Sequence, residues 1–417
     1  MRKIVMVVVG VGALAAAIAL ALMDCGPQDD WDLVGSVLVD EVIPDEDNVY
    51  VGFVAATNAV KEWMETGEFS KVKPERKAAL VAANSEAIAL FREAAHRAYW
   101  LDYSCSENWR NGLCFFSVGV FAKMINLMRW ETESKIENGQ LGSAMDNVRA
   151  LAALSGTMQS RAESVLCWLC ARLAKGLALD FARSIALSPK ATEETLTELR
   201  GMVHSLSDEK RNRQNLYDLV GREAFYMFGG AQRVLEREVA GKKSTIVSLY
   251  SYRPNRTKRI YNEIAVHART LLTNDYSKVD WAAFNNEVEG LRSNSYMPNG
   301  AGRTLLAAVV PTWEAVAKAV ATDCFSCRAT EIVVAAELYR RRNGKRPFSL
   351  SELVPAFLDS VPADPYKPDS PLNYDALCGI IWTVGADGDF NGDKEPEKNS
   401  YGRNRRYVIY LDGTKAQ

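Results

Sequence analysis

The fold class is decided by residues 115–156, "FFSVGVFAKMINLMRWETESKIENGQLGSAMDNVRALAALSG". Apolar residues recur at three- and four-residue spacing on both sides of Asn138-Gly139, which predicts two amphipathic helices separated by a turn. Because the connection is short, the two helices are expected to pack as antiparallel neighbours. The stretch 160–187, which stops before Pro189, repeats this helical pattern. The sequence therefore predicts an irregular domain of antiparallel α-hairpins.

Most of the remaining chain also has a helical period. Further helices are predicted at 48–66, 73–100, 191–206, 209–239, 255–273, 278–292 and 304–343, the last with a break near Cys324. No period of about 34 residues recurs, so a tetratricopeptide array is not predicted. Beyond Gly344 the chain changes to prolines and short strand-like runs. The predicted fold is mainly α, with an all-α domain at 47–303 and a small α+β domain with a short antiparallel sheet at 304–417.

The N-terminal residues predict a membrane anchor. The run from Ile4 to Met23 contains twenty residues without a charge, enough to span roughly 30 Å as a helix. Arg2 and Lys3 precede it and several aspartates follow, which favours an inner-membrane anchor at 1–24 with the bulk outside the cytoplasm. Residues 25–46 form an acidic tether. Two alternatives remain, namely a lipoprotein lipidated at Cys25 and a secreted chain cleaved at an ordinary signal peptide.

The eight cysteines fit a chain that is exported from the cytoplasm. Cys105 and Cys114 flank the polar segment "SENWRNGL", so a disulfide that closes a short surface loop is the favoured interpretation, with two unpaired thiols as the alternative. The pairs Cys167/Cys170 and Cys324/Cys327 could form a zinc site if the fold brought them together. The first pair lies in an apolar helical stretch and the second about 150 residues away, which favours buried or locally paired cysteines instead.

A series of motifs runs through "AAELYRRRNGKRPFSLSELVPAFLDSVPADPYKPDSPLNYDALCGIIWTVGADGDFNGDKE", residues 335–395. A helix ends in Tyr-x-x-x-Asn-Gly-x-x-Pro, followed by Val-Pro-x-Asp-Pro, Pro-Leu-x-Tyr and a strand that ends in Gly-Ala-Asp-Gly. Residues 329–395 resemble the C-terminal globular domain of type II secretion major pseudopilins. The whole chain also resembles anchored exported proteins of planctomycete-like bacteria, a resemblance that implies no activity.

The pseudopilin resemblance implies a calcium site. In that family the loop after Gly-Ala-Asp-Gly binds calcium, which implies Asp387 and Asp389 as ligands here. The residues alone give an EF-hand-like beginning, D-x-D-x-N-G-D, but Lys398 stands where an EF-hand needs a bidentate glutamate. The candidate Ca²⁺ ligands are Asp387, Asp389, Asn391, Asp393 and Glu395, with Glu397 as an alternative last ligand. The other interpretation of this loop is a polar hairpin turn without an ion.

Two departures from pseudopilins limit the resemblance to this module. The sequence "MRKIVMVVVG" lacks a prepilin-peptidase site, and about 300 residues separate the anchor from the module. Assembly into a pilus-like filament is therefore not expected.

The sequence contains no recognisable catalytic motif. His96, His204 and His267 are isolated in helical stretches, and neither a G-x-S-x-G elbow nor a P-loop occurs. The net charge of −2 gives no basic field, so a nucleic-acid partner is not expected. The leading hypothesis is a membrane-anchored extracytoplasmic scaffold with an unidentified protein partner. The rival is an exported hydrolase with a carboxylate site in a groove of the helical domain.

Overall fold

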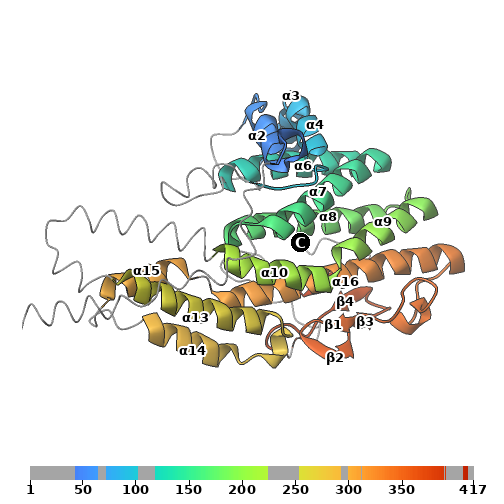
Figure 1. The fold of residues 1–417 in the computed structure, drawn as a ribbon. Coiled ribbons are helices and arrows are strands. Elements are labelled where there is room, and N and C mark those ends of the chain that lie inside the picture. The colour runs from blue at the N-terminus through green and yellow to red at the C-terminus, as the bar shows by residue number, and fades with distance from the viewer. Residues whose placement is uncertain are drawn as a thin grey trace, which may run out of the picture.

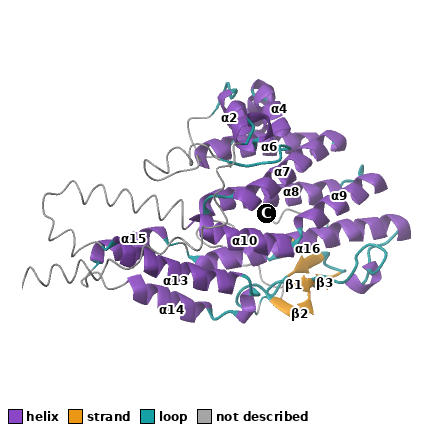
Figure 2. Cartoon of the chain, viewed as in Figure 1, coloured by secondary structure: helices purple, strands orange, loops and turns teal. Residues whose placement is uncertain are grey.

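The computed structural model describes residues 43–63, 72–101, 118–223, 253–292, 299–310, 312–388, 390 and 407–411. These residues are mainly helical, with two small antiparallel sheets near the C-terminal end, which confirms the predicted mainly α class (Figures 1 and 2). None of the helices in these ranges is long and apolar enough to cross a membrane. The predicted anchor at 1–24 lies outside the described residues.

The elements follow one another along the chain in a helical part and a part of short strands. The helices are α2 (Val49–Asn58), α3 (Pro74–Ala83), α4 (Ser85–Ala94), α6 (Val118–Glu137), α7 (Leu141–Arg161), α8 (Val165–Ala186), α9 (Glu193–Leu206), α10 (Glu209–Glu223), α13 (Pro254–Leu272), α14 (Trp281–Arg292), α15 (Gly300–Val309) and α16 (Trp313–Asn343). Short 3₁₀ helices are η1 (Asp45–Asp47), η4 (Tyr276–Lys278) and η5 (Leu350–Leu353). The strands are β1 (Ala363–Asp364), β2 (Lys367–Pro371), β3 (Asn373–Asp375), β4 (Ile380–Trp382) and β5 (Val408–Tyr410).

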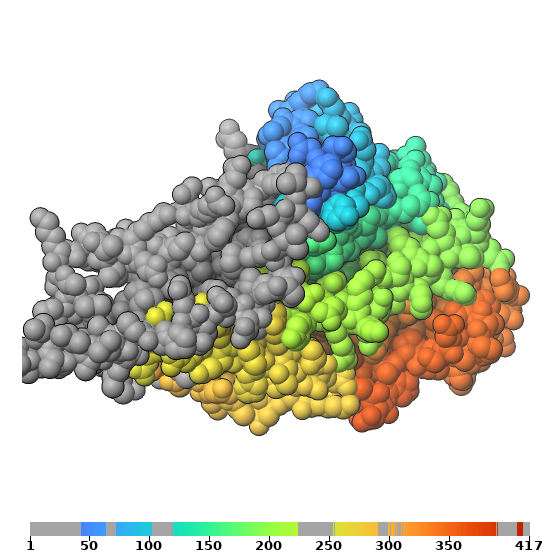
Figure 3. Space-filling model, in the orientation of Figure 1, coloured from blue at the N-terminus to red at the C-terminus, as the bar shows by residue number. Residues whose placement is uncertain are grey.

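The helices are arranged in layers. In Figure 1, α2 to α4 lie at the top, α6 to α9 follow below, and α16 lies between these helices and the small sheets. The space-filling view in Figure 3 shows the surface of the C-terminal elements directly against that of α9 and α10. Buried apolar side chains from α2 through β5 form one continuous hydrophobic core. Described residues before and after the predicted domain boundary at 303/304 therefore belong to the same hydrophobic core. The boundary itself stays a prediction.

The long helix α16 is the central element of this core. Its residues Ile332, Val333, Val334 and Ala335 are consecutive and fully buried, so this part of the helix is enclosed on every side. It packs against α8, α9 and η5. The helix ends at Gly344, which has a φ of 73° and so adopts the left-handed conformation that glycine tolerates. The predicted break near Cys324 is wrong, because α16 passes through that residue without interruption.

The sheets are small and lie beneath α16. Strands β1 and β2 pair with each other, while β4 is the central strand between β3 and β5, and all of these pairs are antiparallel. Ile381 of β4 lies opposite Tyr374 on one side and Ile409 on the other, and its side chain is fully buried. The central residues of β4 and β5, Ile381 and Ile409, therefore lie in the hydrophobic core.

Candidate functional site

A cavity of about 120 Å³ lies where the helical layers meet the small sheets. It is lined by side chains from α8, α10 and α16, by the segment around η4, and by the β1–β2 region. Apolar walls come from Trp168, Leu216, Leu272 and Val320, and the remaining lining is mostly polar or charged. The site is therefore a mixed polar and apolar cavity at the junction between the helical part and the part with strands.

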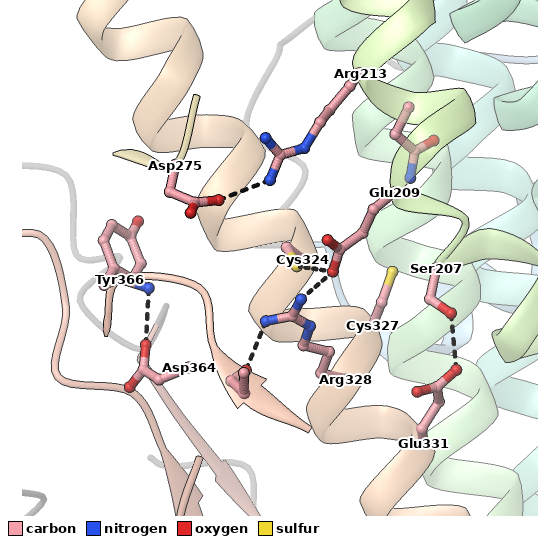
Figure 4. A network of polar contacts seen from close by, with 12 residues as sticks. Ser207, Glu209, Arg213, Asp275, Cys324, Cys327, Arg328, Glu331, Asp364 and Tyr366 are labelled. Atoms are coloured by element: carbon pink, nitrogen blue, oxygen red, sulfur yellow. Dashed lines mark hydrogen bonds and ion pairs between the residues drawn. The ribbon is translucent and has the colours of Figure 1, made fainter. Parts of the chain in front are cut away.

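One ion pair closes the side of the cavity between α10 and α16. The guanidinium of Arg328 contacts the carboxylate of Glu209 and also donates a hydrogen bond of 2.6 Å to the carbonyl oxygen of Ala363 in β1. The thiol of Cys324 donates to the same Glu209 carboxylate at 3.2 Å. Figure 4 shows Glu209 pointing from α10 toward both of these α16 side chains. Arg328 thus joins three elements, namely α10, α16 and β1.

The other two carboxylates of the cavity are paired in the same way. Asp323 accepts two hydrogen bonds from Arg172 of α8, at 2.6 and 2.7 Å. Asp275 accepts one from Arg213 of α10 at 2.7 Å, and this bond lowers the pKa of the Asp275 carboxyl. Each of the three carboxylates in the cavity lining therefore has an arginine partner.

The cysteine pair Cys324/Cys327 lines the cavity as two thiols. Burial raises the pKa of Cys327 and raises that of Cys324 well above its usual value, and the neighbouring Glu209 acts on Cys324 in the same direction. Because the thiolate is the nucleophile and the metal ligand, raised pKa values make both groups poor candidates for either role. The two thiols are suited to donate weak hydrogen bonds.

The predicted zinc interpretation of the cysteine pairs finds no support in the described residues. Cys167 and Cys170 are buried in α8, as expected for the apolar face of a helix, and burial raises the pKa of Cys170 to about 11. In the ranges that the structure covers, no three His, Cys, Asp or Glu side chains converge into a group that could hold a metal ion. Cys25, Cys105 and Cys114 lie outside these ranges, so the lipidation and disulfide hypotheses stay predictions.

Of the predicted calcium ligands, the structure describes Asp387. Its side chain is exposed in the turn that follows β4. Asp389, Asn391, Asp393 and Glu395 lie outside the described residues, as does the alternative ligand Glu397. The turn itself is formed by Gly385 and Gly388, with φ values of 74° and 78°, and by a hydrogen bond of 3.1 Å between them. The calcium site therefore stays a prediction.

The buried residue Asp364 fixes the start of this turn. Its side chain is 0% exposed, and its carboxylate accepts hydrogen bonds from the hydroxyl of Thr383 at 2.5 Å and from the backbone N–H groups of Val384 and Tyr366, both at 2.9 Å. Figure 4 includes the contact with Tyr366. The aspartate of the Val-Pro-x-Asp-Pro motif thus connects β1 to the end of β4, directly before the acidic loop.

The sequence did not identify the cavity. Its charged residues come from α8, α10, α16 and the segment before η4, between positions 175 and 328, and each resembles an ordinary surface charge in the sequence. The pair Cys324/Cys327, for which the sequence favours buried or locally paired thiols over a zinc site, is the sequence signal that falls on the cavity. No family model, curated protein or solved structure matches the chain.

Proposed function

We propose that this chain is a membrane-anchored extracytoplasmic scaffold or interaction protein whose cavity between α8, α10, α16 and β1 holds part of a partner. Residues 1–24 provide the anchor, the irregular α-hairpins provide the body, and the pseudopilin-like residues 329–395 complete the cavity. The observation that carries this proposal is the arginine pairing of every carboxylate in the cavity lining. Such pairs hold the charged side chains of a binding site in a fixed arrangement.

The rival hydrolase has less support from the same residues. Glycoside hydrolysis and related acid–base reactions need one carboxyl group that holds a proton at working pH and a second that is ionised. In the cavity the oxygens of Glu209, Asp323 and Asp275 are engaged by guanidinium groups. Glu223 does have a pKa of about 7, but its side chain is 4% exposed and it is not part of the cavity lining.

If the cavity binds part of a partner, a larger side chain in the cavity should weaken partner binding. Val320 lines the cavity and is partly exposed, so Val320→Phe adds an aromatic ring there. The full chain would be recovered from its native envelope with bound proteins, and partner recovery is expected to fall by about tenfold in the variant, equivalent to roughly 1.4 kcal/mol. Val266→Phe is the matched control, because Val266 is 53% exposed on α13.

Equal loss of the same proteins from both variants, or equal retention in both, would refute the role of the cavity in binding. Circular dichroism of both variants would verify that the helical content is unchanged. If the interaction depends on the cavity, partner recovery should fall in Val320→Phe and stay unchanged in Val266→Phe.

The acidic loop predicts stabilisation by calcium. If Asp387 and Asp389 are ligands, saturating Ca²⁺ should raise the melting temperature of the full chain by about 2–5 °C, because an ion that binds the folded state stabilises it by mass action. The double variant Asp387→Ala/Asp389→Ala should lose this rise. Differential scanning calorimetry in calcium and in chelator measures it, with exposed Asp359→Ala as the control. Superimposable curves for the unmodified chain would remove calcium from the proposal.

A further inference from the structure

Three hydrogen-bond donors in the cavity converge on one carbonyl oxygen. The C-terminal residue of α9, Leu206, accepts from the ammonium of Lys175 at 2.8 Å, from the amide of Asn212 at 3.4 Å and from the thiol of Cys327 at 3.7 Å. All three donors belong to the cavity lining. A carbonyl oxygen has two lone pairs, so it cannot satisfy three donors well. This corner of the cavity therefore has more donors than acceptors.

Lys175 adds an uncompensated positive charge to the same corner. Its side chain is 4% exposed, and no carboxylate of the described residues lies within 4.0 Å of its Nζ. The ammonium has three N–H donors, and Leu206 takes one of them. The C-terminal end of α9 offsets part of the charge through the helix dipole, equivalent to about half an elementary charge. A buried cation is costly without a full anionic partner, so the corner favours an acceptor that carries a negative charge.

The other charges of the cavity do not supply this partner. Glu209 is bound to Arg328, Asp275 to Arg213, and Asp323 to Arg172 outside the lining. Among the cationic side chains that line the cavity in the described residues, Lys175 alone lacks a carboxylate at ion-pair distance. An incoming anion would therefore meet a free cation without displacing an existing ion pair.

The size and walls of the cavity suit a small organic acid or the end of a chain. A volume of about 120 Å³ has room for a carboxylate group with a short aliphatic part. Leu216, Leu272 and Val320 provide an apolar wall for the aliphatic part of such a ligand. A fully hydrated inorganic anion would gain nothing from that wall.

We propose that this corner of the cavity is a carboxylate-binding subsite, in which Lys175 pairs with the carboxylate and the Asn212 amide and the Cys327 thiol donate to it. The inference rests on the proposed binding role of the cavity and names the chemical group that the cavity recognises. The carboxylate belongs either to a small free aliphatic acid or to the end of a partner's polypeptide chain. Both sources present the same group to Lys175.

Calorimetric titration of the purified full chain tests this subsite. The probes are propionate, its neutral analogue propionamide, and an acetylated tetrapeptide with a free C-terminal carboxylate or with an amidated one. At least one carboxylate probe should bind saturably with a dissociation constant of about 1 mM or lower, and its neutral counterpart should bind at least tenfold more weakly. A tighter complex with the peptide assigns the ligand to a partner chain, and a tighter complex with propionate assigns it to a free acid.

Substitution of the lysine provides the decisive comparison. Lys175→Met keeps the length of the side chain and removes its charge, and it should weaken carboxylate binding at least tenfold. Lys210→Met is the matched control, because Lys210 is exposed on α10 and does not line the cavity. If Lys175→Met reduces helical content, Asn212→Ala gives a second test with an expected loss of about threefold to tenfold.

The proposal is overturned if neither carboxylate probe binds saturably up to about 10 mM, or if Lys175→Met binds as tightly as the unmodified chain. Equal binding of sulfate or chloride at the same site would also overturn it, because the subsite is specific for carboxylates. A negative result here would leave the envelope experiment with Val320→Phe unaffected. The failure of the subsite and the failure of the proposed binding function are therefore distinguishable.

Discussion

Glu223→Gln is expected to raise the free energy of unfolding at pH 8 by about 2–3 kcal/mol. Glu223 lies at the end of α10 with a 4% exposed side chain, and burial raises its pKa from 4.5 to about 7. One backbone donor, the N–H of Val165, partly offsets this at 2.7 Å from the carboxylate. Glutamine retains an oxygen that can accept the same hydrogen bond and carries no charge. The variant therefore removes the cost of burying an anion.

The sign of the pH dependence follows from the raised pKa. Below about pH 4.5 the carboxyl is protonated in both the folded and the unfolded chain, so its contribution to stability is complete. As the pH rises toward and through 7, the unfolded chain ionises freely while the folded chain resists ionisation, and that contribution is lost. Tyr261, which faces Glu223 from α13, has its pKa raised well above its usual value and so stays neutral over this range.

Urea unfolding at pH 5, 6, 7 and 8 measures the effect. The difference in stability between Glu223→Gln and the unmodified chain should grow with pH across these values and level off above pH 7. Glu194→Gln on the surface of α9 is the control, with no expected change beyond about 0.5 kcal/mol. A difference that is independent of pH would show that Glu223 is not the titrating group.

Arg172→Met is expected to cost about 2–4 kcal/mol of stability. Arg172 pairs with Asp323 through two hydrogen bonds, donates a third at 3.0 Å to the carbonyl oxygen of Ala319, and lies over the ring of Trp168. The charged side chains are only 15% and 21% exposed, so removal of one leaves the other charge poorly solvated. Methionine preserves the contact with the indole ring, which separates the loss of charge from the loss of packing.

The double variant Arg172→Met/Asp323→Leu should recover most of this loss, because replacing both members of a buried ion pair by apolar groups is often nearly neutral. The pair Arg149–Glu198 joins α7 to α9 with side chains that are 41% and 43% exposed, and it is the matched control. Arg149→Met should cost less than about 1 kcal/mol. Equal costs for Arg172→Met and Arg149→Met would contradict the assignment of a buried pair, as would a double variant no more stable than the single one.

Local sequence patterns identified the helices and missed their tertiary interruptions. The Asn138-Gly139 pair predicts the turn between α6 and α7. In the structure Gly139 adopts the left-handed conformation that glycine tolerates, with a φ of 70°. The predicted helix 73–100 is instead divided at Asn84 and ends at Ala94. Asn84 is fully buried, and its side chain bonds the backbone of Leu80, Lys61 and Glu62. Contacts with a segment more than twenty residues away cannot be inferred from helical periodicity.

The strands were predicted more accurately than the site. The stretches "PLNYDAL", "GIIWTVG" and "RRYVIYLDG" contain the strand-like runs that predict a short antiparallel sheet, and β3, β4 and β5 lie within these stretches. Their apolar residues and the intervening turn are local signals. The cavity depends on the pairing of Arg172 with Asp323 and of Glu209 with Arg328, each across more than 100 residues. Charges alone do not reveal such partners, because exposed and buried ion pairs use the same residue types.

The late position of α16 in the chain imposes an order on folding. Helices α8 and α9 precede it by more than 100 residues, yet α16 covers their apolar faces. A chain that emerges N-terminus first at roughly 5–20 residues per second leaves those faces uncovered for on the order of ten seconds. During that interval the nascent chain exposes apolar surface to other proteins. The apolar faces of α8 and α9 therefore stay open to other contacts until α16 has been synthesised.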